Sequence, residues 1–517
     1  MKRRKSVVCQ ACSGLLAFGM LLLATTARAQ FSAPPPPPTP ATPLPLSGRT
    51  GQSGGVAASA SPVPSTTTSV DTLNLNVSAQ GPYAGSANST RQLPFSGKLS
   101  LQEAIDRGLR FNLGAVGAQQ ALQQSQQQVK ATRSALLPAI SAAANDTEQT
   151  VNLGSIGIGG NATFPGFAIP SLVGPFNVFD VRAYVSQQIM DFTSLNNYRS
   201  SRQLARAGEL AAKDAQDLIV LAVGGQYLQV IAANARLASA RAQLDTSNAL
   251  YQQTMQQLQF GRAAQIDVNR SHVAVLTDQQ RLITLQNEFA KQKLTLARMI
   301  GLPANADYEL ATEMPYAPAP PLTLEDAIKQ AIENRADLKA AEAQVAAAER
   351  ALAAARDERL PSASASANYG EIGRPSHLLP TYTVSATVSM TIWNGGRISS
   401  DIQQAETALA QRRAELEDTR SQIESDVRNA FLDLQAAANQ VTVAQQNVDL
   451  MGETLKETQQ RFEAGVSQSY DIVQSQESVA GARLDYINSV FAHNIAKLSL
   501  ARALGNAPQK LHEFLNF

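Results

Sequence analysis

Few residues in this sequence are of the types that carry out chemistry. No two of the four histidines have the spacing of zinc ligands, and no Gly-x-Ser-x-Gly elbow, P-loop or dinucleotide-binding fingerprint is present. Both cysteines, Cys9 and Cys12, lie near the N-terminus, in a segment interpreted below as a removed leader. The histidines are His272, His377, His493 and His512. We therefore expect no enzyme activity, no cofactor and no metal site.

Two acidic residues stand out because they occupy matching positions. Asp267 follows Gly261, and Asp471 follows Gly465, with the same spacing and 204 residues further along the chain. Each pair lies where one helical pattern ends and another begins, so the glycines are expected to make tight turns. Taken alone, Asp471 fits an ordinary solvated helix residue or a carboxylate that favours the positive end of a helix dipole.

These positions belong to a duplicated chain. Leu99-Ser-Leu-Gln-Glu-Ala-Ile105 matches Leu322-Thr-Leu-Glu-Asp-Ala-Ile328, 223 residues later. The Leu-Pro dipeptide at Pro138 recurs at Pro361 with the same offset, and the offset then falls to 204 after an intervening region. Two long copies indicate an internal duplication and not a solenoid of short repeats.

Each copy is predicted to open with a helix. Ser100-x-x-Glu103 and Thr323-x-x-Asp326 resemble capping boxes, in which a hydroxyl accepts from an orphan backbone amide. These helices are expected to run to about residues 136 and 359, because a proline follows two positions later in each copy.

The hydrophobic period then changes to two. Residues 381–392 alternate between apolar and hydroxyl side chains, which predicts a 12-residue strand with Ser362 to about Glu371 as its partner. The first copy offers less regular strands at Ala139–Val151 and Val178–Met190. Such strands favour a transmembrane barrel, although a half-buried soluble sheet fits the same alternation. Four strands cannot close a barrel, so several chains would be needed.

A sustained seven-residue period follows the strands. Val427, Leu434, Val441, Val448, Leu455 and Phe462 form one row in the second copy, and the first copy has an equivalent row from Val223 to Leu258. This pattern predicts coiled-coil helices of about 65 residues, roughly 100 Å long. Gln265–Ile300 and Leu324–Asp357 are each about half that length, so two short helices stacked end to end would match one long helix.

The N-terminus predicts export from the cytoplasm. Residues 1–29 combine a basic start, a short apolar stretch and an Ala27-Arg28-Ala29 cleavage site, which favours a signal peptide over a membrane anchor. Residues 30–97 are rich in Pro, Gly and Ser and are expected to be disordered, as a tether or an unstructured remnant. Without the leader the net charge is −4, which argues against a nucleic-acid partner.

Together these features resemble the TolC-like outer-membrane efflux protein family, also called outer membrane factors. The residues that carry the resemblance are Leu324-Glu-Asp-Ala-Ile328, Arg461-Phe-Glu-Ala-Gly465 with Asp471-Ile-Val473, and the first-copy motif Leu101-Gln-Glu-Ala-Ile105. Both copies carry them in the same order, over about residues 99–506. The domains expected are a first efflux repeat at 98–310, a second at 311–506 and a C-terminal tail at 507–517.

The resemblance implies a mostly α fold with a small β part. Long coiled-coil helices would form an α-barrel, and four strands per chain would contribute to a trimeric 12-stranded transmembrane β-barrel. It implies a homotrimeric channel in outer-membrane lipid, with helices extending into the periplasm. The channel would be the passive exit duct of a tripartite efflux or type I secretion system. A periplasmic adaptor and an inner-membrane RND or ABC pump would load it with drugs, metals or proteins.

The resemblance also implies site residues at the periplasmic tip. The channel constriction would include Asp471, Asp267 and Gln474, where Gln474 replaces a second acid of the family. The tip that meets the adaptor would include Gly261, Arg262, Gly465, Val466 and Ser467. The family links the acid at position 267 to an Arg and a Tyr, but Ser467 and Phe462 occupy those places, so Arg262 or Arg461 could substitute.

One other class of protein fits part of the pattern. A periplasmic coiled-coil scaffold or adaptor would explain the seven-residue period. It would not explain the long alternating strands or the hairpins that join them. We therefore expect the channel function.

Overall fold

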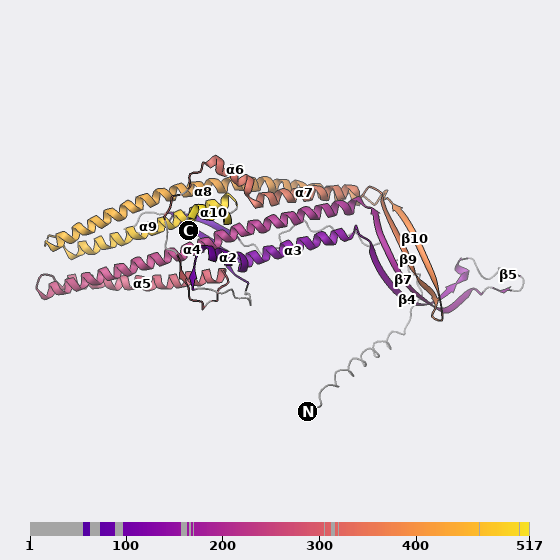
Figure 1. Cartoon of the computed structure of the whole chain (residues 1–517), viewed down its shortest axis with the longest axis horizontal. Helices are drawn as coiled ribbons and strands as arrows, with labels where there is room; N and C mark the ends of the chain where they lie inside the picture. Colours follow the sequence, from indigo (N-terminus) through magenta and orange to yellow (C-terminus); the bar gives the residue numbers. More distant parts are fainter. Residues whose placement is uncertain are drawn as a thin grey trace, which may run out of the picture. The chain divides into compact units, whose positions relative to one another are not determined.

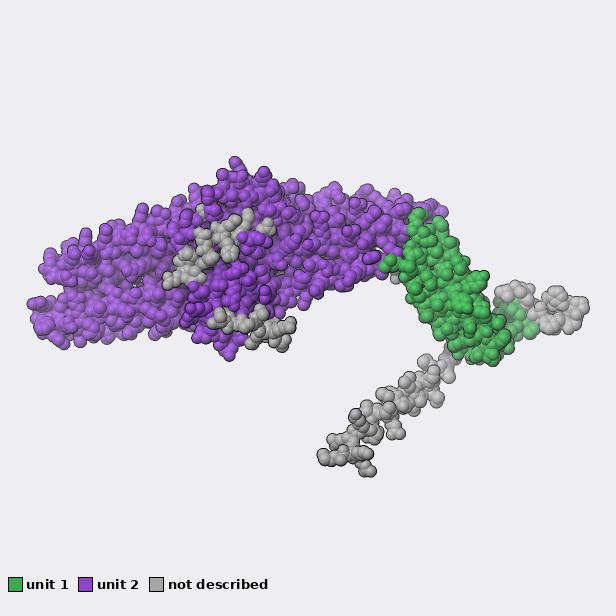
Figure 2. All heavy atoms as spheres, viewed as in Figure 1, with its two compact units in different colours: residues 1–46, 137–190, 363–388 green, residues 47–136, 191–362, 389–517 purple. Residues whose placement is uncertain are grey.

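The computed structural model describes residues 55–62, 73–87, 97–156, 163–164, 167–168, 170–303, 305–311, 316–318, 320–464, 466–505 and 507–515. The expected signal peptide and Gly465 lie outside the described residues. The chain divides into two compact units, which Figure 2 distinguishes by colour. One contains residues 137–190 and 363–388; the other contains 47–136, 191–362 and 389–517.

The first unit is an antiparallel sheet of four strands in the order β10-β9-β7-β4. The strands are β4 (Ala139–Asn152), β7 (Leu172–Met190), β9 (Ser362–Arg374) and β10 (His377–Ser389). Strands β4 and β7 form one hairpin and β9 and β10 form another, one from each half of the chain, and β7 pairs with β9. The short pair β5 (Thr163–Phe164) and β6 (Phe167–Ala168) and the turn η2 (Leu153–Ile156) lie between β4 and β7.

The sheet has two chemically distinct faces. Hydrogen bonds join Ser366 to Ser385 (2.7 Å) and Ser362 to Ser389 (3.1 Å), so these hydroxyls share one side, the polar face. By strand register that face also carries Ser141, Asn145, Thr147, Asp180, Arg182, Tyr184, Ser186 and Asn368. The opposite, apolar face carries Ile140, Ala142, Val181, Val185, Ala367, Tyr369, Val384 and Val388. Its large side chains are exposed, with Tyr382 at 75% and Val384 at 74%.

The strand expected at residues 381–392 is displaced. Strand β10 begins earlier, at His377, and stops at Ser389, so Met390 to Ile392 lie beyond it. Ser389 lies opposite Ser362, the first residue of β9, and the residue before Ser362 is Pro361, which has no backbone N–H to extend the ladder. At the other end, only two residues separate β9 from β10.

The second unit is a set of long helices (Figure 1). Helices α4 (Phe192–Gln259) and α8 (Arg397–Glu463) run for 68 and 67 residues, as the seven-residue period predicts. Helices α5 (Gln265–Met299) and α9 (Ser469–Ala503) pack beside them as the returning arms of two hairpins, each 35 residues long. The chain is therefore mostly helical with a smaller strand part, as the sequence predicts.

The opening helix of each copy is broken, which corrects the expectation of one continuous helix. The first copy has α2 (Leu101–Phe111) and α3 (Leu113–Ser134); the second has α6 (Leu324–Asn334) and α7 (Ala336–Asp357). The expected N-caps are present, since Ser100 accepts from Glu103 N (3.1 Å) and Thr323 from Asp326 N (3.2 Å). The breaks fall at Asn112 and Arg335, whose backbones are extended (ψ 134° and 126°).

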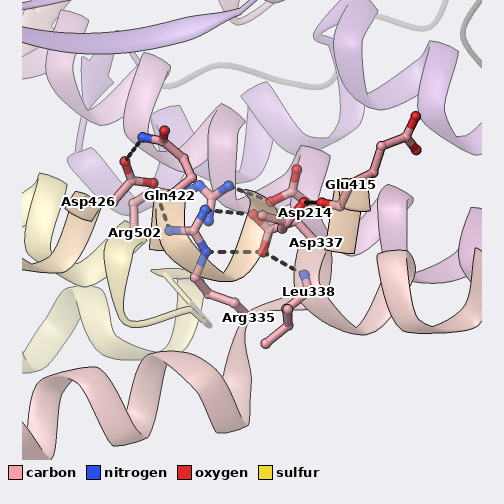
Figure 3. A network of polar contacts seen from close by, with 9 residues as sticks. Asp214, Arg335, Asp337, Leu338, Glu415, Gln422, Asp426 and Arg502 are labelled. Atoms are coloured by element: carbon pink, nitrogen blue, oxygen red, sulfur yellow. Dashed lines mark hydrogen bonds and ion pairs between the residues drawn. The ribbon is translucent and has the colours of Figure 1, made fainter. Parts of the chain in front are cut away.

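The two breaks are equivalent positions that use different chemistry. Asn112 is fully buried; its amide nitrogen donates to Tyr83 O (2.8 Å) and Met299 O (3.3 Å), and its amide oxygen accepts from Gly114 N. Arg335 is 5% exposed and forms ion pairs with Asp337 (2.6 Å) and Asp426 (2.9 Å), as Figure 3 shows. The break between α2 and α3 is therefore stabilised by a neutral amide, and the break between α6 and α7 by ion pairs.

Part of the expected disordered segment is folded. Strands β1 (Val56–Pro62) and β2 (Leu73–Ala79) pair antiparallel, and η1 (Gly81–Ala84) follows. Leu75 is 1% exposed, and a Cβ on Gly225 of α4 would lie 2.7 Å from Val77. The expectation of disorder is wrong for these residues, because a few apolar side chains of β2 pack on the helices.

The core of the helical unit lies where these elements meet. Buried residues from α2, α4, α6, α8 and α9 form one large cluster, which the C-terminal helix α10 (Ala507–Leu515) and the short parallel pair β3 (Lys98–Leu99) and β8 (Glu309–Leu310) join. Helix α4 has an 18-residue window apolar enough to cross a membrane, but 78% of that window is buried inside the protein. This window is therefore explained as a core segment.

Candidate functional site at the helix turns

The candidate site comprises the two turns that join the long helices to their partners. Helix α4 ends before Gly261, which adopts a left-handed conformation (φ +70°) with no atom near the missing Cβ. The backbone N–H of Arg262 donates to Gln257 O (2.8 Å) and so closes the turn. In the second turn, Val466 N donates to Arg461 O (2.9 Å) at the equivalent position. The expected tip residues Gly261, Arg262, Val466 and Ser467 therefore lie in these two turns.

Asp267 and Asp471 occupy the third position of helices α5 and α9. The carboxylate of Asp267 accepts from the backbone N–H of Ala264 (3.3 Å), and that of Asp471 accepts from Gln468 (3.1 Å). Each acid therefore satisfies a backbone amide that the helix leaves without a partner, which explains its place in the sequence. This helix-capping role holds whatever else the side chains do.

The two acids differ in their second hydrogen bond. Asp267 Oδ1 accepts from the hydroxyl of Ser469 (2.7 Å), which belongs to α9 of the other repeat, and Ser469 is 4% exposed. Asp471 Oδ2 accepts from Ser467 (2.6 Å) of its own turn, and Asp471 is exposed. The side chain of Asp267 therefore forms a contact between the two repeats, whereas that of Asp471 faces solvent.

The environment of Asp471 favours its charged form. The hydrogen bond from Ser467 is the largest cause that lowers the pKa of the Asp471 carboxyl, followed by the backbone bond from Gln468 and then the charge of Arg461. Asp471 therefore stays ionised at and below neutral pH.

A small groove of about 280 Å³ lies beside Asp471 on the α8–α9 hairpin. Its lining residues are Met451, Thr454, Asp471, Gln474, Ser475 and Ser478. Ser475 donates to Thr458 of α8 (3.2 Å), which ties the two helices together beside the groove. The structure thus brings Asp471 and Gln474 together in one groove and places Asp267 in the contact between α5 and α9.

The arginines expected as substitutes have other roles. The cationic partner of Asp267 is Arg270, at 3.9 Å and one turn further along α5. Arg461 acts on Asp471 through its charge, and Arg262 is an exposed turn residue. Sequence reasoning missed Ser469, since a serine in a turn gives no signal of a contact with the other repeat.

In the described part of the chain, no three His, Asp or Glu side chains are arranged to hold a metal ion. His493 and Lys497 are buried on one face of α9, and burial lowers the pKa of His493 to about 4 and that of Lys497 to about 8. Both sit in the helical core, away from the two turns.

The chain is similar to known channel proteins. A family model described as outer membrane efflux protein matches residues 112–302 and 327–506. Pyoverdine export outer membrane protein OpmQ of Pseudomonas aeruginosa is 24% identical over 60% of this chain and 66% of its own length. Probable efflux pump outer membrane protein TtgC of Pseudomonas putida is 22% identical over 78% and 83%. The chain thus matches about two thirds or more of the length of these relatives.

Solved structures share the fold. A membrane protein of Pseudomonas aeruginosa superposes with a TM-score of 0.70 at 20% identity, over 81% of this chain and 97% of that one. The Campylobacter jejuni CmeC outer membrane channel gives 0.68 at 14% identity, over 84% and 94%. These likenesses establish the arrangement of helices and strands.

Proposed function

The chain belongs to the outer membrane efflux protein family, and we propose that three copies form the exit duct of a tripartite efflux system. Its place is the outer membrane, with the helices in the periplasm, and its role is that of an exit duct for efflux. The trimer, the adaptor, the pump and the site residues at the helix turns are the proposed parts.

The observation that carries the proposal is the two-faced sheet. A sheet with exposed Val, Ile and Tyr on one face and hydroxyls on the other fits a barrel wall between lipid and water. Four strands per chain require three chains for a 12-stranded barrel. A soluble scaffold protein would leave the apolar face uncovered. This sheet therefore favours the channel over the scaffold.

We assign the helix turns to the adaptor contact. Phe260 is 79% exposed, Val466 69% and Ile266 56%, so both turns present apolar side chains to solvent. Clusters of exposed apolar side chains are typical of a protein-binding surface. Of the expected residues, Gly261, Arg262, Val466 and Ser467 lie here; Gly465 is assigned by its place in the sequence.

We assign the constriction to Asp471, with Gln474 beside it. Three exposed carboxylates around a pore axis would attract cations, as charged rings do in cation channels. Asp267 was expected in the same ring, but its bond to Ser469 favours a tethering role between α5 and α9.

The duct itself would be passive. Relatives and family are transport channels. We propose that the protein is not an enzyme and that a pump of the RND or ABC class supplies the energy. The relatives' names cover pyoverdine export and efflux pumps, and we infer a small-molecule cargo for this chain.

Membrane fractionation tests the assembly. The protein is expected in the outer-membrane fraction, as a band of three times the chain mass that heating converts to the monomer. A soluble periplasmic protein that runs as a monomer without heating would instead support the scaffold.

A further inference from the structure

The polar face of the sheet carries one ion pair at the middle of β7. Arg182 Nε donates to Asp180 Oδ1 (2.6 Å), and Nη2 donates to Oδ2 of the same carboxylate. The guanidinium also lies over the ring of Tyr184, 5.7 Å from its centroid. The side chains are 24% and 16% exposed, so the pair is held against the sheet.

A glycine makes room for this pair on the neighbouring strand. Gly370 of β9 lies opposite Arg182. A Cβ built on Gly370 would lie 2.6 Å from Arg182 Cγ and 2.0 Å from the carbonyl oxygen of Val181. No side chain fits at position 370, and the stem of Arg182 occupies that space. The arginine is therefore seated in the sheet and its position is fixed by the strand register.

The remainder of the polar face is uncharged between the strand ends. Within the described strands, residues 141–149, 180–188, 362–372 and 379–389 of this face are hydroxyl, amide, small or apolar residues apart from Asp180 and Arg182. The two charges are opposite and paired through two parallel hydrogen bonds, the strongest geometry for an arginine and a carboxylate. Over these ranges, which stop short of the strand-end residues Arg374 and His377, the net charge of the polar face is therefore zero.

We propose that Asp180 and Arg182 are specificity-determining residues that keep the sheet-lined part of the duct electrically neutral. This inference rests on the proposed function, in which the polar face lines the pore of a trimer. Loss of either partner would leave three like charges facing one another across the pore, which selects ions by sign. The intact pair avoids this, so that cargo of either charge passes a surface of hydroxyls and amides. Charge selection is then left to Asp471.

Planar-bilayer recordings of the reconstituted full-length protein in a KCl gradient test the inference. Wild type is expected to favour K⁺ because of Asp471. Asp180→Asn leaves the arginines uncompensated and should lower the K⁺/Cl⁻ permeability ratio by about threefold or more at low salt. Arg182→Gln should raise the ratio by a similar factor. The double variant Asp180→Asn/Arg182→Gln is neutral again and should return to the wild-type ratio.

The matched control removes a carboxylate from the other face. Glu371 lies opposite Val181 on the apolar face, so Glu371→Gln should leave the ratio unchanged. Wild-type ratios in both single variants would overturn the inference while the channel function stands. If a single variant fails to form channels, the double variant decides. A charge-neutral double variant whose ratio departs from wild type contradicts the proposal. Absence of conductance from the wild type would contradict the proposed function itself.

Discussion

The hydroxyl of Ser469 donates to the carboxylate of Asp267 across 2.7 Å, and so joins α9 of the second repeat to α5 of the first. The equivalent acid of the second repeat, Asp471, has its hydroxyl partner in its own turn. Duplication has therefore produced two similar acids with different surroundings. One holds the two hairpins together and the other presents its charge to solvent.

Ser469→Ala should loosen the contact between the hairpins. The substitution leaves a half-buried carboxylate without one of its donors, which should lower the free energy of unfolding by about 1 kcal/mol. Because the bond joins two hairpins, hydrogen exchange near residues 265–270 should become faster. Ser478→Ala is the control, since its hydroxyl bonds only within α9. Unchanged hydrogen exchange in Ser469→Ala would show that the bond between Ser469 and Asp267 does not stabilise the contact between the hairpins.

Ser467→Ala should change how cation preference depends on pH. Ser467 is the largest cause of the lowered pKa of Asp471, so wild type should keep its carboxylate charge, and with it its K⁺ preference, to a lower pH than an ordinary aspartate. In Ser467→Ala the pKa rises, and the preference should be lost at a higher pH. Recordings from pH 7 down to pH 3 measure both midpoints. Coincident midpoints would remove Asp471 from the constriction.

Arg335→Ala should strongly destabilise the second repeat. The guanidinium is 5% exposed and pairs with Asp337 and Asp426, so its removal leaves two carboxylates without their counter-charge. Loss of one partner of a fully buried pair costs about 3 kcal/mol or more, and because the carboxylates here are 25% and 37% exposed, we expect about 2 kcal/mol. Arg397→Ala is the control, because Arg397 also pairs with two carboxylates but is 56% exposed and should cost less than about 1 kcal/mol. Equal denaturation midpoints for the two variants would contradict the account.

The ion pair between Arg335 and Asp337 predicts that the free energy of unfolding depends on pH in the acid range. Burial opposes ionisation of Asp337, but the hydrogen bonds and charge of Arg335 outweigh it and lower the pKa of Asp337. A lowered pKa in the folded state adds stability above the unfolded value, near 4, which is lost as the pH falls through the folded value. Asp337→Asn should therefore be less stable at pH 7 and lose less stability between pH 5 and 2. An equal loss of stability between pH 5 and 2 in wild type and Asp337→Asn would contradict this role of Asp337.

Two glycines should respond to alanine in opposite directions. Gly505 has φ +74°, and a Cβ there would lie 3.0 Å from the backbone nitrogen of Arg335, so Gly505→Ala should destabilise by about 1–2 kcal/mol. Gly452 lies within α8 with no atom near its missing Cβ, and Gly452→Ala should stabilise by about 0.5–1 kcal/mol. Thermal unfolding measures the change in midpoint temperature of each variant. A shift of the same sign in both variants would contradict the prediction.

The long helices and the strands of the four-stranded sheet could be predicted from the sequence because they follow from local and periodic signals. The seven-residue rows gave the long helices α4 and α8, and the alternation near Tyr382 gave strand β10 within a few residues. Ser100 and Thr323 were recognised as N-caps because the capping pattern spans only four residues.

The missed features depend on contacts between distant residues. Asn112 breaks a helix because its amide bonds to Tyr83 and Met299, and Arg335 does so with Asp426 as a partner. Asn is a common residue at helix ends, so Asn112 could have been read as a cap, but Arg335 has no such signature. The contact of Ser469 with Asp267 could not be predicted because it joins the two repeats. The packing of Arg182 against Gly370 could not be predicted because it depends on the register of two strands.

Single-channel recording of the purified protein in planar bilayers tests the exit duct most directly. We expect discrete conductance steps with a preference for K⁺ that falls in Asp471→Asn. A correctly folded protein that adds no conductance to the bilayer would contradict it.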